Sequence, residues 1–267
     1  RGLESLSGLA GMSAKVEKVV RDKLAGGAAG KTVSNDVGAL SSVCTWAKTR
    51  KYISEDPRLG LSKMDKTPQS KGRLFTADEI FRLLAASPPD RRLLYEVALK
   101  SGLRANELRS LTIDHLDVVR GGLILDAEWT KNSKPGFQPL PRELVERLEE
   151  YAANGRAEEA YADRFARGNH EPTWPDRALL YVPKNTAISL NRDLKAAGIE
   201  KVTTAGKLDF HAFRVAFINS GADVKTAQTL ARHSTAEMTM NVYGRAQDER
   251  LADVVERMGQ NLNNPQQ

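Results

Sequence analysis

Apolar residues recur at helical spacing along most of the chain. Between residues 31 and 53 they lie three or four positions apart, which predicts a helix whose start Thr32 or Ser34 would cap. The same spacing predicts further helices over residues 80–86, 90–101, 142–153, 189–197, 211–219, 223–232 and 246–258.

Two of these helices carry recognisable ends. Thr76 and Glu79 form a capping-box pattern ahead of the apolar run "IFRLLAA". Gly102 follows the helix expected to end at Ser101, where a left-handed residue commonly terminates a helix. We therefore expect both boundaries to appear in the structure.

The pattern changes between residues 121 and 141, "GGLILDAEWTKNSKPGFQPLP". A short apolar run, a turn-rich stretch and a second short run predict a β-hairpin or a three-stranded sheet. Residues 64–73 are polar and basic and predict a linker, and 168–180 predict a loop. The tail "GQNLNNPQQ" lacks apolar anchors, which is typical of disorder. The predicted fold class is mainly α with a small β-sheet (α+β).

Composition narrows the class of protein. The chain has 267 residues, 40% hydrophobic and 28% charged, which suits a globular protein of one large or two ordinary domains. No apolar run reaches the roughly 18 residues of a membrane span, and no secretion leader opens the chain. A lone cysteine, Cys44, fits a reducing compartment. These features predict a cytoplasmic protein without membrane contact.

Positive charge gathers in the first quarter. Residues 1–73 hold 14 Lys and Arg against 7 Asp and Glu, whereas the remainder holds 26 against 27. A basic segment beside a neutral body suggests a polyanion partner, most often nucleic acid, and charge alone leaves a solvated basic surface without a partner as the alternative. The candidate DNA contacts in the densest part are Lys48, Arg50, Lys51, Lys63, Lys71 and Arg73.

Six polar residues in otherwise apolar settings suggest chemistry at a phosphodiester without metal: Arg104, Lys131, His211, Arg214, His233 and Tyr243. Arginines bind phosphate oxygens in pairs and stabilise transition-state charge. Histidine and lysine can move protons, and tyrosine can be a covalent nucleophile. Taken singly, each residue also suits an ordinary structural role, such as a helix-face ion pair or a buried histidine.

Their order decides between these interpretations. "SGLRANELRSL", "TKNSK…QPLP", "HAFR" and "ARHSTAEMTMNVY" follow one another as in the tyrosine recombinase (phage integrase, Xer-like) family, which the chain resembles. The upstream stretch 32–57 resembles the end of that family's helical core-binding domain. The resemblance implies a truncated N-terminal DNA-binding domain over 1–65, a linker over 66–73 and a catalytic domain over 74–267.

The resemblance also implies roles for these residues. Tyr243 would attack the scissile phosphate, and Arg104, Arg214 and His233 would hold its oxygens. His211 would accept the tyrosine proton, and Lys131, or less plausibly Lys134, would protonate the leaving 5′ oxygen. Glu107 would orient the site. Members of the family form 3′-phosphotyrosine links without metal, ATP or other cofactor, as homotetramers on paired sites in double-stranded DNA.

One departure from the family affects this expectation. Only six residues separate Arg214 from Gly221, about four fewer than in the family, which is close to one helical turn of ~3.6 residues. The shortening either preserves the helix faces or displaces His233 and Tyr243. The alternatives to an integrase of a mobile element are therefore a catalytically impaired DNA-binding relative and a type IB topoisomerase-like enzyme. The segment 250–267 would dock either on a neighbouring subunit or on its own domain.

Overall fold

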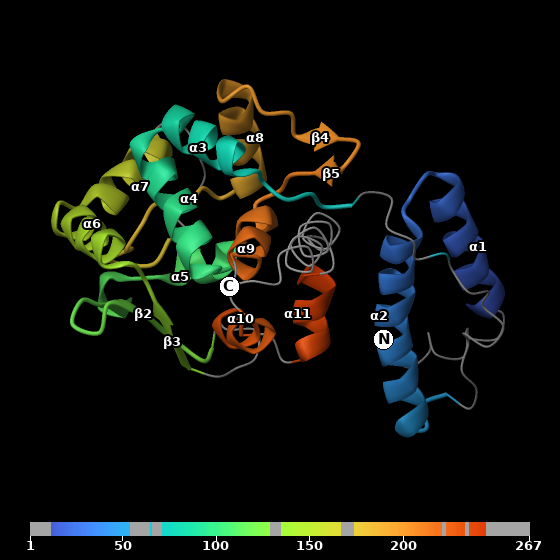
Figure 1. The fold of residues 1–267 in the computed structure, drawn as a ribbon. Coiled ribbons are helices and arrows are strands. Elements are labelled where there is room, and N and C mark those ends of the chain that lie inside the picture. Colours follow the sequence, from blue (N-terminus) through green and yellow to red (C-terminus); the bar gives the residue numbers. More distant parts are fainter. Residues whose placement is uncertain are drawn as a thin grey trace, which may run out of the picture. The chain divides into compact units, whose positions relative to one another are not determined.

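The computed structural model describes residues 12–53, 65, 71–128, 135–166, 174–220, 223–232 and 235–243, with the backbone alone at 12, 13 and 241–243 (Figure 1). The chain divides into two compact units, 1–71 and 72–267. The described residues are mainly helical with two small antiparallel sheets, which confirms the predicted fold class. None of the helices in these ranges has the length and apolar character needed to cross a membrane.

In the first unit, two helices follow one another, α1 (Met12–Ala25) and α2 (Gly30–Thr49). The predicted helix over 31–53 is confirmed as α2, although it ends four residues earlier. The predicted caps Thr32 and Ser34 are wrong, because the helix already begins at Gly30 and its N-cap is Ala29, which makes no side-chain cap bond. The sequence analysis did not find α1.

Most helices of the second unit lie where the sequence predicted them. Those with a predicted counterpart are α3 (Ala77–Ala86), α4 (Pro89–Ser101), α6 (Arg142–Ala153), α8 (Thr186–Ala196), α9 (His211–Ile218) and α10 (Val224–Leu230). Those without one are α5 (Ala105–Ser110), α7 (Arg156–Ala166) and α11 (Ala236–Tyr243). The helix predicted over 246–258 and the tail lie outside the described residues.

Both predicted helix ends are present. Thr76 Oγ1 accepts from the Glu79 N–H at 3.1 Å, and Glu79 Oε2 accepts from the Thr76 N–H at 3.0 Å, which completes the capping box of α3. Gly102 ends α4 in the left-handed conformation, with φ of 62°. A β-carbon at Gly102 would lie 2.3 Å from Phe217 Cδ1, so only glycine allows α9 to approach the end of α4 this closely.

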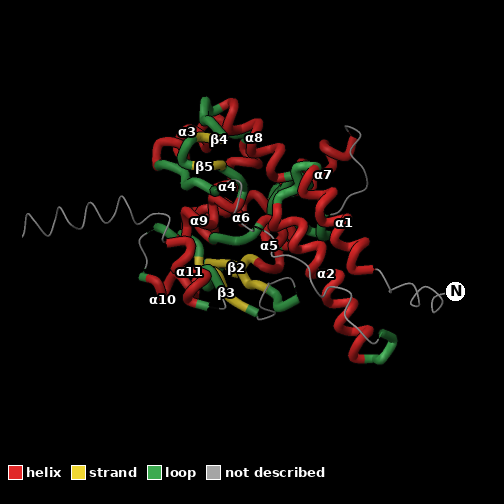
Figure 2. The backbone as a smooth tube through the Cα atoms, turned by 90° about the vertical axis from the view of Figure 1, so that its right-hand side faces the viewer, coloured by secondary structure: helices red, strands yellow, loops and turns green. Residues whose placement is uncertain are grey.

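A three-stranded antiparallel sheet confirms the prediction over 121–141, although its first strand lies upstream of that range (Figure 2). The strands are β1 (Leu116–Asp117), β2 (Gly122–Leu125) and β3 (Gly136–Pro139), in spatial order β1-β2-β3. Leu125 pairs with Gly136 and Leu123 with Gln138. The segment joining β2 to β3 contains Lys131, which lies outside the described residues. A further hairpin, β4 (Val202–Thr203) with β5 (Gly206–Lys207), was not predicted.

The core of the second unit centres on the packing of α9 against α4. Phe213, which is almost fully buried, stacks on Tyr95 and on Phe75, with ring centroids 5.0 Å apart in both pairs. Around this aromatic cluster pack leucines and valines from α3, α5, α6, β2 and α8. Because α9 carries Arg214, whose Nη1 donates to the Gly102 carbonyl, this packing places Arg214 beside the end of α4.

A buried ion pair joins α4 to α8. Asp193 Oδ2 accepts from Arg91 Nε at 2.6 Å and from the Tyr95 hydroxyl at 2.7 Å, and its Oδ1 accepts from Arg91 Nη2 at 2.7 Å. Burial, together with the hydrogen bond to Asp193, raises the pKa of Tyr95, and the hydrogen bond to Asp193 raises the pKa of Arg91. Tyr95 therefore stays neutral and Arg91 stays charged at neutral pH inside the core.

We expect Asp193→Ala to lower the free energy of unfolding by about 3–5 kcal/mol, because it leaves the Arg91 guanidinium buried without a counter-charge. Equilibrium urea unfolding measures the change. The control is Glu146→Ala, which removes an exposed partner of Arg142 and should cost less than about 1 kcal/mol. Similar small losses in both variants would contradict the role given to Asp193.

Candidate active site

Arg104 and Glu107 meet at the start of α5. Arg104 occupies the N-cap position, and Glu107 lies in the first turn, where an acidic side chain is favoured by the exposed backbone N–H groups. Glu107 Oε2 accepts from the Arg104 N–H at 2.7 Å, and Oε1 accepts from Arg104 Nη1 at 2.8 Å. The Arg104 side chain is 27% exposed, and within the described residues only its Nη1 is hydrogen-bonded. Its Nε and Nη2 have no hydrogen-bond partner among the described residues.

Arg214 lies beneath this surface, only 1% exposed. Its Nη1 donates to the Gly102 carbonyl at 2.5 Å and its Nη2 to the Ala231 carbonyl, whereas its buried Nε has no partner in the described part of the chain. Burial lowers the pKa of Arg214 to about 9, with further lowering by the charge of Arg104 that Glu107 opposes. The group is still a cation at neutral pH.

Two residues that the sequence analysis missed complete the cluster. Arg232 Nη2 donates to Glu107 Oε2 at 3.0 Å, and its Nη1 donates to Gln138 Oε1 at 3.0 Å. Burial lowers the pKa of Arg232 as well. The sequence offered two signals for these residues: Arg232 directly precedes His233, and Gln138 is a polar residue in an apolar strand. Neither signal distinguishes a buried residue from a solvated one.

The other predicted catalytic residues are only partly described. His211 is the first residue of α9, exposed and three positions before Arg214. Tyr243 ends α11, which packs against α9 and α10, and its side chain lies outside the described part. Lys131 and His233 lie outside the described residues altogether. Nevertheless, the Arg214 bond to Ala231 keeps the residues just before His233 beside the arginines, despite the short α9.

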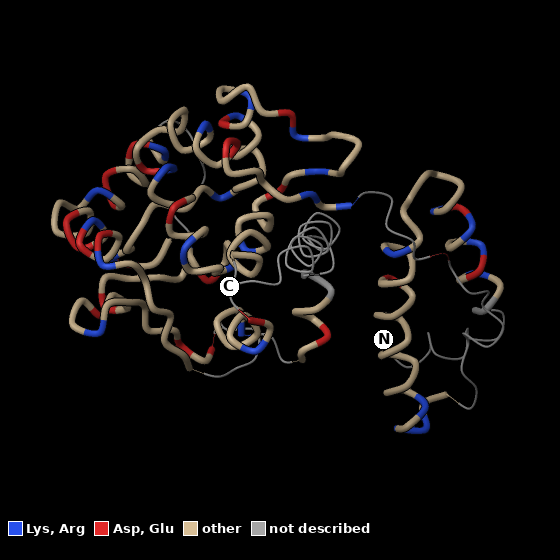
Figure 3. The backbone as a smooth tube through the Cα atoms, in the orientation of Figure 1, with Lys and Arg blue, Asp and Glu red and all other residues tan. Residues whose placement is uncertain are grey.

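The predicted DNA contacts differ in their availability. Lys48, Arg50, Lys51 and Lys71 are exposed, and Figure 3 shows basic residues at the C-terminal end of α2. Arg73 is not supported as a DNA contact, because its side chain is 8% exposed and its guanidinium binds Glu79 through two bonds of 2.8 and 2.9 Å. Lys63 lies outside the described residues.

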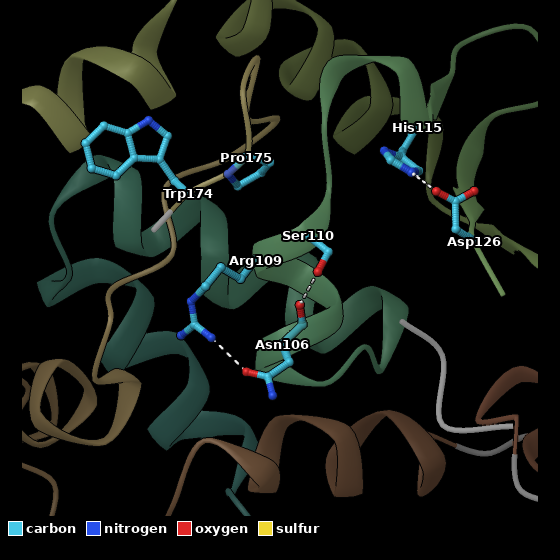
Figure 4. A pocket seen from close by; sticks show the side chains of 7 residues that line it. All are labelled: Asn106, Arg109, Ser110, His115, Asp126, Trp174 and Pro175. Atoms are coloured by element: carbon cyan, nitrogen blue, oxygen red, sulfur yellow. Dashed lines mark hydrogen bonds and ion pairs between the residues drawn. The ribbon is translucent and has the colours of Figure 1, made fainter. Parts of the chain in front are cut away.

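A solvent-facing hollow of about 590 Å³ lies beside α5 but contains none of the predicted catalytic residues (Figure 4). Its polar groups are engaged locally. Arg109 donates to Asn106 Oδ1 and to the Pro183 carbonyl, and His115 bonds Asp126 through Nε2 at 3.0 Å. In the described ranges, no three His, Cys, Asp or Glu side chains form a group able to hold a metal ion. The arginine cluster is thus the better candidate for a site.

The charge balance of the cluster defines what it can bind. Three guanidinium groups, from Arg104, Arg214 and Arg232, surround the single carboxylate of Glu107. Guanidinium groups match the geometry of phosphate oxygens and keep their charge at neutral pH. Donors that are already fixed in place stabilise developing negative charge without reorganising. The arrangement is therefore suited to a phosphate group.

Comparisons with known proteins identify the family of the chain. The model of the phage integrase family matches residues 73–250. Tyrosine recombinase XerA of Thermococcus kodakarensis is 28% identical over 198 residues, which cover 73% of this chain and 66% of that protein. Tyrosine recombinase XerD of Pseudomonas putida is 31% identical over 150 residues, which cover 55% of this chain and 47% of that protein. The chain thus spans about two thirds and about half of these relatives.

Two solved structures share the fold. A lambda integrase dimer bound to a COC′ core site has a TM-score of 0.62 at 19% identity, covering 86% of this chain and 63% of that one. The Tn1549 transposon integrase in complex with transposon right end DNA has a TM-score of 0.58 at 20% identity, covering 90% and 85%.

We expect Glu107→Gln to lower the free energy of unfolding by about 3 kcal/mol or more, because it removes the carboxylate from among three cations. Equilibrium urea unfolding measures the loss, and added sulfate should restore more stability in the variant than in the wild type. Glu146→Gln, at an exposed glutamate on α6, is the control. An unchanged urea midpoint for Glu107→Gln would mean that the arginines do not depend on this carboxylate.

Proposed function

Because the chain belongs to the phage integrase family, we propose that it is a site-specific recombinase that cuts and rejoins double-stranded DNA through a covalent tyrosine link. The observation that carries the proposal is the pairing of Arg104 and Arg214 around Glu107. These residues are 110 positions apart in the sequence; Arg104 is hydrogen-bonded to Glu107, and the charges of both Arg104 and Glu107 act on the pKa of the buried Arg214. The recombinase names of the relatives support the same activity.

In this mechanism, the scissile phosphate binds over Arg104 and Arg214. Arg104 donates to a non-bridging oxygen through the guanidinium nitrogens that Glu107 leaves unused. Arg214 contributes its charge from a buried position, and its Nε donor has no partner in the part of the chain that the structure describes. As phosphorus becomes five-coordinate, negative charge grows on these oxygens, and each fixed donor is worth about 3 kcal/mol of stabilisation. His233 adds a further hydrogen bond.

Tyr243 then supplies the nucleophile. Its Oη forms a bond to phosphorus while the bond from phosphorus to the 5′ oxygen breaks. His211 accepts the tyrosine proton, and Lys131 gives a proton to the departing 5′ oxygen. The products are a 3′-phosphotyrosine link and a free 5′-hydroxyl. Since the link conserves the phosphodiester energy, a 5′-hydroxyl of another strand can reverse the reaction without ATP.

The basic residues of the first unit support a role in holding the duplex. Lys48, Arg50, Lys51 and Lys71 are exposed and would contact phosphates, which position a protein on DNA without specifying the sequence. We further propose that four copies act together on paired sites and that the DNA belongs to a mobile element. The domain assignment proposed is a DNA-binding domain over 1–65, a linker over 66–73 and a catalytic domain over 74–267.

We expect Tyr243→Phe to abolish the covalent protein–DNA adduct and to leave DNA affinity unchanged, because only the nucleophilic hydroxyl is lost. The test incubates protein with nicked duplexes from the DNA that flanks its own gene, without metal or ATP, and detects adducts on denaturing gels. Tyr151→Phe is the control, since it removes a hydroxyl that donates to Asp90 on α4. It should form the adduct as the wild type does.

The outcomes separate the alternative functions. An adduct that survives Tyr243→Phe would move the nucleophile elsewhere. Tight binding by the wild type without any adduct would favour a DNA-binding relative that acts by occupying its site. Relaxation of supercoiled DNA by single copies, without demand for sequence, would favour a topoisomerase-like enzyme.

We expect the double variant Lys48→Gln, Lys51→Gln to bind all duplexes more weakly and to flatten the dependence of log K on log salt by about 0.9 for each lost phosphate contact. Binding is measured between about 50 and 200 mM salt. The control neutralises Lys184 and Lys195, two exposed lysines of the second unit, and so removes the same charge elsewhere. Equal effects of the two pairs would show that net charge, and not this part of α2, governs binding.

A further inference from the structure

Arg232 joins two segments that are far apart in the sequence. Its guanidinium donates to Glu107 Oε2 at the start of α5 and to Gln138 Oε1 on β3, both at 3.0 Å. All three side chains are buried or nearly so: Arg232 is 11% exposed, Glu107 3% and Gln138 1%. Since Glu107 also binds Arg104, the bridge runs without interruption from β3 to the arginine expected to bind phosphate.

The stem of Arg232 also lies over β3. A β-carbon added at Gly136 would lie 3.8 Å from Arg232 Cδ. Gly136 and Gln138 are two residues apart on a strand and so share a face. Gly136 pairs with Leu125 at the end of the hairpin from which the segment with Lys131 departs. Arg232 thus holds the base of that segment.

The backbone of Arg232 indicates that this side chain is used. Its φ is 52°, in the left-handed region that glycine adopts freely and that other residues rarely occupy. Its buried Nε has no hydrogen-bond partner among the residues that the structure describes. A glycine would avoid both costs. The two hydrogen bonds to Glu107 and Gln138 explain why an arginine stands here despite the left-handed backbone and the unpaired Nε.

From these contacts, we propose that Arg232 is a positioning residue that locks the β2–β3 hairpin against Glu107, so that Lys131 reaches the leaving 5′ oxygen. The inference rests on the proposed function and deepens it. In this proposal Arg232 acts through its bonds to Glu107 and Gln138, which occupy its two terminal nitrogens, and not through a contact of its own with the DNA. Its removal should therefore impair the protonation of the leaving group more than the binding of DNA or the attack by Tyr243.

The test compares two nicked duplexes in single-turnover cleavage. One has the natural 5′ oxygen at the scissile bond, and the other has sulfur in its place. In both, the Tyr243 Oη–phosphorus bond forms and the tyrosine proton goes to the base. The 5′ oxygen leaves with a proton from Lys131, whereas the sulfur leaves as a thiolate and needs no acid. A defect confined to proton donation therefore disappears with the sulfur substrate.

We expect Arg232→Gln and Arg232→Gly to lose about 100-fold in cleavage of the oxygen substrate, the effect of a displacement near 1 Å, with unchanged DNA affinity. Both should recover most of the wild-type rate on the sulfur substrate. Arg232→Gly relieves the strain of the left-handed backbone and removes the bridge. A loss of cleavage rate in this variant therefore comes from the missing side chain and not from backbone strain. Combining Arg232→Gln with Lys131→Ala should add no further loss, since both act on one step.

The matched control is Arg177→Gln. The backbone of Arg177 is also left-handed, with φ of 56°, but its side chain is exposed and pairs with Asp114. It should behave as the wild type on both substrates. Equal losses of an Arg232 variant on the oxygen and sulfur substrates, or no loss on either, would overturn the proposal.

A readout without catalysis separates this inference from the proposed function. Amide hydrogen exchange over 122–125 and 136–138 should be faster in Arg232→Gln than in Arg177→Gln, because the hairpin loses its anchor. If the wild type forms no adduct with either substrate, the proposed function fails, and exchange then decides the anchoring by itself. Unchanged protection of the hairpin in Arg232→Gln would overturn the anchoring.

Discussion

The buried guanidinium of Arg214 is the interaction on which the site depends. It donates to the carbonyls of Gly102, at the end of α4, and of Ala231, after α10, while its own helix α9 packs on α4. Three segments therefore meet at one side chain. The left-handed Gly102 is a condition for this, because any β-carbon there would collide with Phe217 and push α9 away.

The site holds more positive charge than its own carboxylate can balance. Glu107 binds Arg104 and Arg232 directly, and the partners of Arg214 among the described residues are two carbonyls. Desolvation lowers the pKa of Arg214 and of Arg232, because removing a guanidinium from water destabilises its charged form. Such a cluster lowers the stability of the free protein, and binding of an anion stabilises it. That is the balance expected where binding energy is reserved for a charged transition state.

Outside the site, buried charges are matched. Asp193 meets Arg91 with two bonds, and Glu79 meets Arg73 in the same way. These pairs tie helices and loops together, and each buried guanidinium has a carboxylate of its own as counter-charge. The contrast explains why Arg73, although basic and next to the expected linker, does not belong with the exposed lysines of α2. A count of charges along the chain cannot distinguish a buried, paired arginine from an exposed basic residue.

The sequence by itself determined the features that depend on neighbours within one helical turn or one hairpin. The capping box of Thr76 and Glu79, the glycine end of α4 and the helix over 142–153 all obey local rules. The order of the polar motifs also sufficed to suggest the family. Local patterns failed for short or highly charged helices: α5 has only six residues, and the apolar face of α7 consists mainly of alanines and one tyrosine among charged residues.

Tertiary structure alone decided which charges face one another. Arg232 bonds to groups 94 and 125 residues away, and Arg214 to a carbonyl 112 residues away. No spacing rule reaches that far, because these contacts exist only after α9 has packed on α4 and β3 has paired with β2. An arginine is ordinarily expected to be solvated, so its burial is a property of the folded core. The sequence thus named Arg104, Glu107 and Arg214, and the packing of the core added Arg232 and Gln138.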